Sequence, residues 1–85
     1  MMDINYELYK VFYHVATTLN FSEASKQLFI SQSAVSQSIK TLERKLDQTL
    51  FIRSTKKVQL TPEGEILLRH TEPAMNLIQK GEAQL

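Results

Sequence analysis

The segment from Ser31 to Leu46 limits what this chain can fold into more than any other. Its apolar residues recur at steps of four, three and four, the period of a helix with one buried side. They are Val35, Ile39, Leu42 and Leu46. The opposite side carries amides, hydroxyls and one lysine: Gln32, Ser33, Ser36, Gln37 and Lys40. Because a solvated helix surface normally mixes both signs of charge, this surface predicts a close fit to a polar partner, the major groove of DNA.

Two further helices are predicted before this segment. The first covers residues 5–19, and its apolar residues again step by four, three and four. They are Leu8, Phe12, Val15 and Leu19, with Tyr9, Tyr13 and Ala16 beside them. The second is short, residues 23–28, with Ser22 as its N-cap. Because only residues 29–30 separate it from Ser31, the expected cap of the next helix, these segments predict a helix-turn-helix.

A small β-hairpin is predicted after Leu46. Two β-favouring runs, residues 50–52 and 58–60, flank a polar and basic turn at residues 53–57. The turn lacks the Asn-Gly or Asp-Gly pair that is the strongest signal for a tight hairpin. Its cations are Arg53, Lys56 and Lys57. They form either a solvated loop or a phosphate contact, and the neighbouring helix-turn-helix favours the phosphate contact.

The rest of the chain predicts one long helix that begins after Thr61 and continues to Leu85. Thr61 is a favourable N-cap, and Pro62 suits the first helical position. Pro73 should kink the helix between residues 69 and 73. One apolar stripe consists of Leu67, Ala74 and Ile78. Because other apolar residues extend around neighbouring faces, the helix should pack partly on its own domain and partly on a second copy of the chain.

Length and composition exclude several classes of protein. A chain of 85 residues allows one small domain, and no apolar run is long enough to span a membrane. The first ten residues lack the basic and then apolar character of a signal peptide, so a cytoplasmic location is expected. The absence of cysteine agrees with that location, and it removes thiol chemistry and most structural zinc sites.

Positive charge is concentrated in the middle of the chain. The net charge is only +1, but residues 22–57 carry seven basic and three acidic side chains. The flanking segments, residues 1–21 and 58–85, together carry three basic and six acidic side chains. This distribution places the predicted DNA-binding surface on the helix-turn-helix and the hairpin.

The sequence resembles the N-terminal DNA-binding region of the bacterial LysR-type transcriptional regulators. The similarity begins at Phe12 and Ala16 and includes FSEASKQL at residues 21–28 and SQSAVSQSI at residues 31–39. It continues through Leu42, Glu43, Leu46, Leu50, Phe51 and Arg53 to LTPEG at residues 60–64. Any single piece would be a weak signal, but the ordered set in one short chain is specific.

The resemblance implies a mainly α protein, with a winged helix-turn-helix in residues 1–60 and a linker helix in residues 61–85. It implies a homodimer in which the linker helix pairs antiparallel with its counterpart, and the stripe of Leu67, Ala74 and Ile78 is expected to lie in that contact. It also implies that a full-length relative continues into an effector-binding domain, absent here. A small-molecule effector would act only through that domain, and no cofactor is implied.

The resemblance also assigns roles along the predicted binding surface. The positions that face base edges are Gln32, Ser33 and Gln37. Those near the DNA backbone are Ser22, Ser31, Ser36, Lys40 and Arg53, to which we add Lys56 and Lys57 of the hairpin. Three residues depart from the common pattern of the family. Ser33 stands where proline is frequent, Gln37 where arginine is frequent, and Asp47 where glycine usually ends the helix.

Two hypotheses about function follow from these patterns. The first is sequence-specific binding of double-stranded DNA as a dimer, with two recognition helices, residues 31–46, in successive major grooves of an inverted repeat. The hairpin wing would then lie on the DNA backbone or in the minor groove. The second is a winged-helix protein-interaction domain that dimerises through its last helix, which the low net charge slightly favours. An enzyme is the weakest option, because His14 and His70 have no convergent partners at helical spacing. We therefore predict no catalytic residue and no metal ligand.

Overall fold

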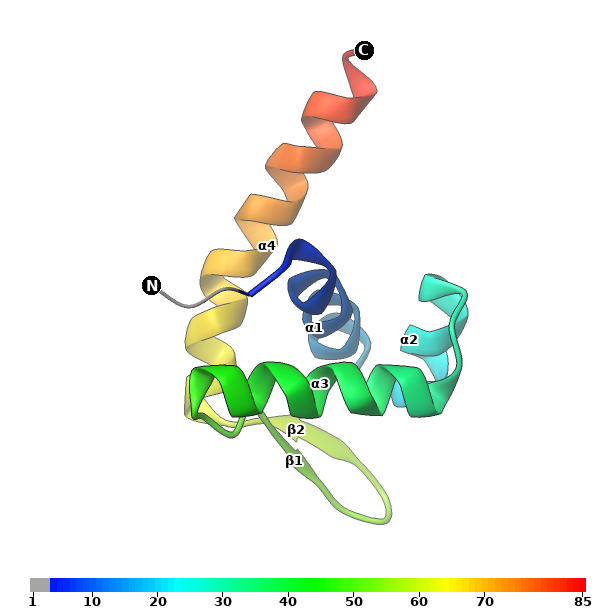
Figure 1. Ribbon diagram of the computed structural model, residues 1–85, viewed down its shortest axis with the longest axis vertical. Helices are drawn as coiled ribbons and strands as arrows, with labels where there is room; N and C mark the ends of the chain where they lie inside the picture. Colours follow the sequence, from blue (N-terminus) through cyan, green and yellow to red (C-terminus); the bar gives the residue numbers. More distant parts are fainter. Residues whose placement is uncertain (1–3) are drawn as a thin grey trace.

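The computed structural model describes residues 4–85, which form four helices and one two-stranded hairpin (Figure 1). The elements are α1 (Tyr6–Thr18), α2 (Phe21–Leu28), α3 (Gln32–Leu46), β1 (Phe51–Arg53), β2 (Val58–Leu60) and α4 (Pro62–Ala83). Helices α1, α2 and α3 pack together, the hairpin lies below α3, and α4 extends away from them (Figure 1). The predicted fold class, a mainly α winged helix-turn-helix with a long last helix, is confirmed. Residues 1–3 of the predicted first domain lie outside the described residues.

An apolar core lies between the first three helices and the hairpin. Its largest fully buried side chains are Phe12, Val15, Val35, Leu42 and Leu50. The predicted inward stripe of α3 is confirmed, although its last member, Leu46, is only half-buried. The prediction that Leu19 belongs to the buried stripe of α1 is wrong, because Leu19 is 42% exposed. Leu19 ends the helix with φ 52°, and this left-handed conformation turns its side chain out of the stripe.

Side-chain caps determine where α3 and α4 begin. Ser31 Oγ accepts a hydrogen bond from the backbone N–H of Ala34 at 3.1 Å. Thr61 Oγ1 accepts one from the N–H of Gly64 at 3.0 Å, and Pro62 follows as the first helical residue. Each cap satisfies a backbone donor that the helix itself leaves unpaired. The predicted starts of both helices are therefore confirmed.

The predicted start of α2 is wrong by two residues. Asn20 Oδ1 accepts the backbone N–H of Glu23 at 2.9 Å, so Asn20 is the N-cap and Ser22 lies in the first turn. Asparagine and serine are about equally good caps. The start at Asn20 makes Phe21 the first helical residue, and Phe21 is buried, with only 7% of its surface exposed.

Three helices end at a non-glycine residue in the left-handed conformation. They are α1 at Leu19, α2 at Phe29 and α3 at Asp47, with φ between 52° and 58°. Asp47 therefore ends α3 in the conformation for which glycine is usually selected, as its departure from the family pattern predicts. Its backbone N–H donates to the Arg44 carbonyl at 3.2 Å, which completes the last turn.

We predict that Asp47→Gly raises the free energy of unfolding by about 0.5–1 kcal/mol, because glycine adopts a positive φ without the steric strain of a Cβ atom. Asp47 is exposed, and the substitution keeps the backbone hydrogen bond to Arg44. Urea denaturation followed by circular dichroism measures the change. A midpoint that stays the same or falls would show that Asp47 is not strained at this position.

The base of the hairpin is tied to both neighbouring helices. A carboxylate oxygen of Glu43, on α3, accepts the backbone N–H of Leu50 at 2.7 Å and that of Phe51 at 3.3 Å. On the other side, Thr61 Oγ1 donates to the Thr49 carbonyl at 2.6 Å. Strands β1 and β2 pair antiparallel between these ties, with Phe51 opposite Leu60. The hairpin is therefore held in a fixed place relative to α3.

Helix α4 packs on the domain as far as Met75. Leu67 and Leu68 lie against the core, and Thr71 and Met75 are buried. Beyond Met75 every residue is exposed. The helix is continuous across Pro73, and the kink expected there stays a prediction. Among residues 4–85, no helix is both long enough and apolar enough to cross a membrane.

Candidate nucleic-acid interface

The outer face of α3 presents the polar side chains that the sequence singles out. Gln32, Ser33 and Gln37, the predicted base-facing residues, are all exposed. Ser33 and Gln37 are four residues apart and so lie one above the other on the helix surface. Near the start of the helix, Ser31 Oγ and Ser33 Oγ lie 3.1 Å apart. The structure thus brings the three side chains together on the first two turns of α3.

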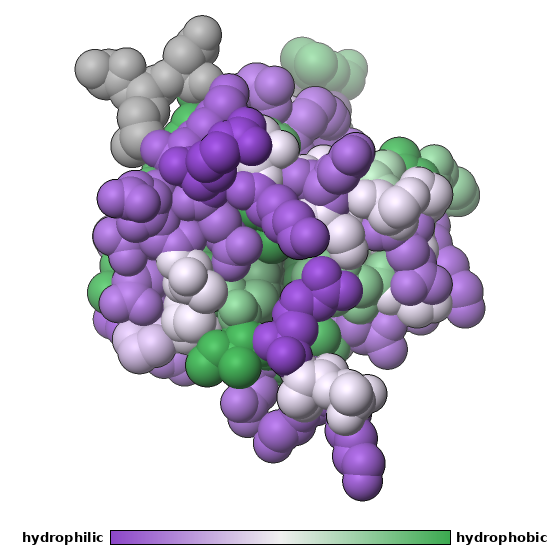
Figure 2. Space-filling model, turned by 60° about the horizontal axis from the view of Figure 1, so that its bottom comes forward, coloured by the Kyte–Doolittle hydropathy of each residue, from purple (hydrophilic) through white to green (hydrophobic). Residues whose placement is uncertain are grey.

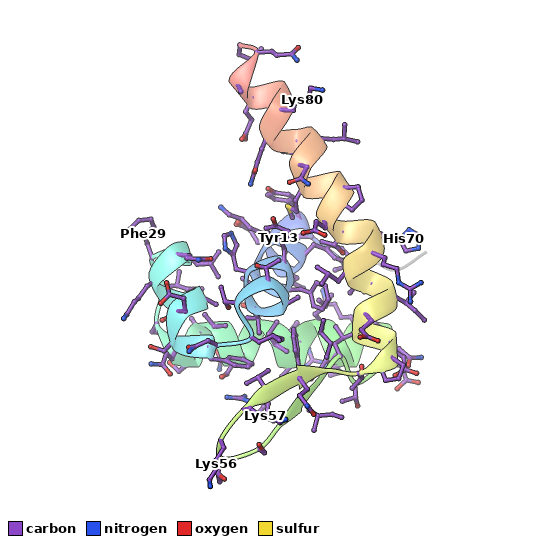
Figure 3. All side chains as sticks on the ribbon, turned by 180° about the vertical axis from the view of Figure 1, so that it is seen from behind. Tyr13, Phe29, Lys56, Lys57, His70 and Lys80 are labelled. Atoms are coloured by element: carbon purple, nitrogen blue, oxygen red, sulfur yellow. The ribbon has the colours of Figure 1, made fainter. Side chains whose placement is uncertain are left out.

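The hairpin places a second polar surface beside α3. Its turn is closed by the Ser54 N–H, which donates to the Lys57 carbonyl at 2.9 Å. Lys56 and Lys57 are exposed at the end of the hairpin that is farthest from α4 (Figure 3). Figure 2 brings this lower side of the molecule forward, and the surface there is mainly hydrophilic. Both lysines are therefore free of the core and available to an anionic partner.

Arg53 joins the hairpin to both helices of the helix-turn-helix. Its guanidinium carbon lies 3.8 Å from the centroid of the Phe21 ring, at the start of α2. Its Nη1 donates to Ser36 Oγ, on α3, at 3.4 Å. Two residues predicted to lie near the DNA backbone are thus in direct contact. The contact with Phe21 was not predicted, because residues this far apart in the chain leave no signal in a single sequence.

A polar hollow of about 240 Å³ lies between the start of α2 and the hairpin. Its walls include Asn20, Phe21, Arg53, Ser54, Lys56 and Lys57. All three basic side chains of the hairpin therefore border the same space, which suits a phosphate group. Ser22 and Ser36 are half-buried, whereas Ser31 and Lys40 are exposed. The predicted backbone-facing residues accordingly differ in how accessible they are.

The two histidines lie on different helices, His14 on α1 and His70 on α4. His14 is half-buried, and its Nδ1 lies 2.7 Å from Gln27 Oε1, so it joins α1 to α2 through a polar contact. His70 is exposed on α4. Within residues 4–85, no three histidine, cysteine or acidic side chains cluster closely enough to hold a metal ion.

An apolar groove of about 290 Å³ runs between α1 and α4. It is lined by Leu67, Ala74 and Ile78, the predicted dimerisation residues, together with Tyr6, Tyr9, His70, Thr71 and Met75. Ile78 is 41% exposed, a large fraction for an isoleucine. The structure thus brings the three predicted residues into one mostly apolar surface.

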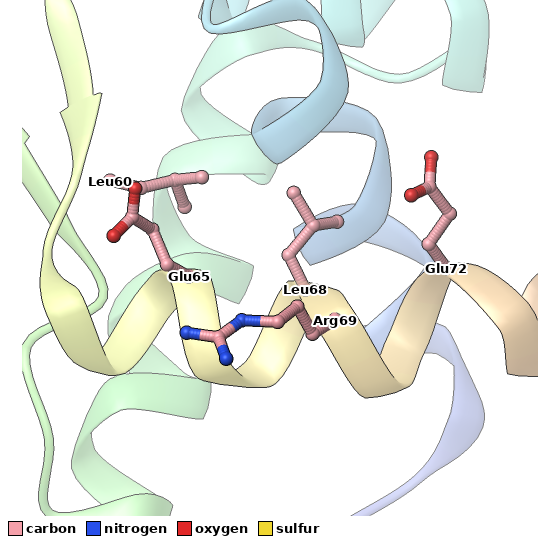
Figure 4. A pocket seen from close by; sticks show the side chains of 5 residues that line it. All are labelled: Leu60, Glu65, Leu68, Arg69 and Glu72. Carbon is pink, nitrogen blue, oxygen red and sulfur yellow. The ribbon is translucent and has the colours of Figure 1, made fainter.

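A second hollow on α4, of about 320 Å³, has a different chemistry. It is lined by Leu60, Glu65, Leu68, Arg69 and Glu72 (Figure 4). Three of these five residues are charged, so this hollow does not offer an apolar partner the continuous surface that the groove offers. The groove between α1 and α4 is therefore the better candidate for contact with a second chain.

Residues 6–65 match the family model described as "Bacterial regulatory helix-turn-helix protein, lysR family". The chain belongs to the LysR family. The match begins with α1 and ends just inside α4, so it includes the outer face of α3 and the hairpin. It does not include Leu67, Ala74 or Ile78. Family membership therefore supports the helix-turn-helix more directly than it supports the dimer contact.

Curated LysR-type relatives are similar over most of this chain. The HTH-type transcriptional regulator PerR of Escherichia coli strain K12 is 43% identical over 76 residues, which cover 89% of the chain and 26% of PerR. The regulator HdfR of Yersinia enterocolitica is 39% identical over 79 residues, 93% of the chain and 27% of HdfR. The chain thus spans about a quarter of the length of these relatives.

Solved structures of LysR-type proteins have the same fold. The oxidized form of OxyR from Corynebacterium glutamicum aligns with a TM-score of 0.86 and 32% identity, covering 92% of the chain and 25% of that protein. A DNA complex of CbnR_DBD aligns with a TM-score of 0.83 and 26% identity, covering 95% of the chain and 93% of CbnR_DBD. The winged helix-turn-helix is therefore the DNA-binding fold of this family.

Proposed function

We propose that the chain binds double-stranded DNA in a sequence-specific manner, as a dimer on an inverted repeat, and serves as the DNA-binding part of a bacterial transcriptional regulator. The observation that carries the proposal is the outer face of α3, where amides and hydroxyls are exposed beside the basic hairpin. The solved complex of CbnR_DBD with DNA supports it, since its fold is the same. A location in the cytoplasm follows from contact with bacterial DNA.

In the proposed complex, the first two turns of α3 enter the major groove and read base edges. Gln32 and Gln37 offer an amide donor and acceptor, and Ser33 offers a hydroxyl. A glutamine can pair bidentately with adenine, whereas the arginine frequent at position 37 in the family favours guanine. The operator of this protein should therefore differ from those of its relatives at the base pair that Gln37 contacts.

The proposed backbone contacts come from the edges of this surface. Lys40 lies one turn beyond Gln37 on α3, and Arg53, Lys56 and Lys57 border the hollow beside the hairpin. Ser22, Ser31 and Ser36 add hydroxyl donors to phosphate oxygens. Such contacts position the protein on the duplex and carry no sequence information directly. They account for affinity, and the α3 face accounts for specificity.

We further propose that a second copy of the chain covers the apolar groove and pairs α4 with its counterpart. Two helix-turn-helix units would then bind half-sites about one helical turn apart. A small-molecule effector would act through a further domain of the longer regulators. We assign no catalytic activity, because the side chain in contact with His14 is the neutral amide of Gln27 and His70 is exposed on α4.

A titration measured by fluorescence anisotropy tests DNA binding against the alternative of a protein-interaction domain. The chain should bind mixed genomic duplexes at low salt. Its affinity should fall steeply as the salt concentration rises, because each phosphate contact releases counterions from the DNA. We predict that the double substitution Lys56→Ala and Lys57→Ala makes the negative slope of log K against log [salt] less steep by about 1–2. No binding at low salt would exclude the proposed function, and an unchanged slope would exclude contact by the hairpin lysines.

The dimer contact is tested by Ile78→Glu. A carboxylate in the apolar groove should weaken dimerisation by about tenfold or more, because a charge cannot be buried there without a partner. Sedimentation velocity over a range of concentrations measures the dissociation constant. Leu77→Glu serves as the control, since Leu77 is 69% exposed and does not line the groove. Equal effects of the two substitutions would contradict the assignment of the groove.

A further inference from the structure

We infer that Phe21 is a positioning residue that holds the Arg53 guanidinium ready for a DNA phosphate. The inference rests on the proposed function, since it takes Arg53 as a backbone contact. It concerns a residue that does not itself reach DNA. Phe21 is 7% exposed, so its role would be carried entirely through Arg53.

The geometry of the pair indicates a fixed arrangement. The Arg53 guanidinium carbon lies 3.8 Å from the centroid of the Phe21 ring, well inside the range of a cation–π contact. The Phe21 ring also meets the ring of Phe51 edge-on, with the centroids 6.3 Å apart and an interplanar angle of 70°. The ring that carries Arg53 is therefore itself held by the core.

A hydrogen bond to Ser36 also restricts the orientation of the Arg53 guanidinium. Arg53 Nη1 donates to Ser36 Oγ at 3.4 Å, which links the side chain to α3. A guanidinium has five N–H donors, so this bond leaves others available for phosphate oxygens. Arg53 also borders the 240 Å³ hollow beside Lys56 and Lys57, where a phosphate would be accessible.

Holding Arg53 in place before binding should strengthen binding. A free arginine side chain samples many rotamers, and ordering it on DNA opposes association. The stacking on Phe21 and the bond to Ser36 select one orientation in the free protein. Because these partners lie on α2 and α3, the arrangement also fixes the hairpin cation relative to the helix that reads the bases.

A double-mutant cycle on DNA affinity tests this inference. Phe21→Leu should weaken binding to specific and random duplexes alike by about two- to fivefold, the range expected for a lost cation–π contact. In an Arg53→Ala background, Phe21→Leu should have no further effect. Phe12→Leu is the matched control, because Phe12 is buried in the same core and its ring lies against Phe51, whereas Arg53 stacks on the Phe21 ring. Circular dichroism at the assay temperature confirms that each variant is folded.

The outcomes separate this inference from the proposed function. If Arg53→Ala itself leaves affinity unchanged, the backbone role proposed for Arg53 fails. If Arg53→Ala weakens binding but Phe21→Leu does so no more than Phe12→Leu, the positioning role is overturned while the proposed function stands. An equal effect of Phe21→Leu with and without Arg53 would also overturn it, because the loss would then be structural.

A spectroscopic readout tests the contact without DNA. The side-chain protons of Arg53 should show an upfield ring-current shift in the NMR spectrum of the free protein. The shift should disappear in Phe21→Leu and persist in Phe12→Leu. Random-coil shifts for the Arg53 side chain in the unsubstituted protein would show that Phe21 does not hold it, and would overturn the inference even if Phe21→Leu failed to fold.

Discussion

Gly64→Ala should lower the free energy of unfolding by about 2–4 kcal/mol, in the range of a severe overpacking substitution. A Cβ atom at this position would overlap the Leu50 carbonyl oxygen and would lie 2.9 Å from Leu60 Cδ2. The carbonyl cannot move away easily, because it accepts the Thr61 N–H at 3.0 Å. The start of α4 would have to shift relative to the hairpin. Urea denaturation followed by circular dichroism measures the loss.

The chain contains its own control for this experiment. Gly81 also lies in α4, but a Cβ atom there would have no neighbour within 4 Å. Gly81→Ala should therefore stabilise the protein by up to about 1 kcal/mol through helix propensity. Equal unfolding midpoints for the two variants would contradict the close packing of Gly64 against Leu50.

The second large effect is on sequence preference. Gln37→Ala should weaken binding to the operator by about tenfold or more, since a bidentate base contact is worth about 1–3 kcal/mol of discrimination. Binding to random duplexes should be nearly unchanged, because Gln37 contributes no charge to the phosphate contacts. Gln37→Arg should shift the preferred base from adenine to guanine. Competition titrations with single-base variants of the operator measure both effects.

Arg53→Ala is the matched comparison for the substitutions of Gln37. Arg53→Ala should weaken binding to operator and random duplexes alike. It should also make the negative slope of log K against log [salt] less steep by about 1. If Gln37→Ala instead weakened binding to operator and random duplexes equally, Gln37 would be a backbone contact. Its proposed contact with a base edge would then be wrong.

The helices and the hairpin could be predicted from sequence because local signals specify them. The period of Val35, Ile39 and Leu42 predicts both the helix and its buried side, and all three side chains are buried. Thr61 followed by Pro62 predicts the start of α4 to the residue. The start of α2 could not be predicted in this way. Asn20 and Ser22 are both good caps, and the burial of Phe21 in the tertiary structure decides between them.

The candidate site could be predicted only in part. Exposed amides and hydroxyls on α3 follow from helical periodicity, so Gln32 and Gln37 were found as a group. The contacts that hold the hairpin were missed, because no periodic sequence pattern specifies them. Glu43 accepts N–H groups of Leu50 and Phe51, and its part in fixing the hairpin depends on how the loop folds back onto α3.

The most direct test of the central claim is selection of binding sites from random duplexes by the 85-residue chain. We predict that the selected pool converges on an inverted repeat whose half-sites lie about one helical turn apart. Each half-site should contain an adenine at one position, and selection with the Gln37→Arg variant should yield guanine at that position. A pool that stays random after repeated rounds with folded protein would contradict sequence-specific recognition by α3.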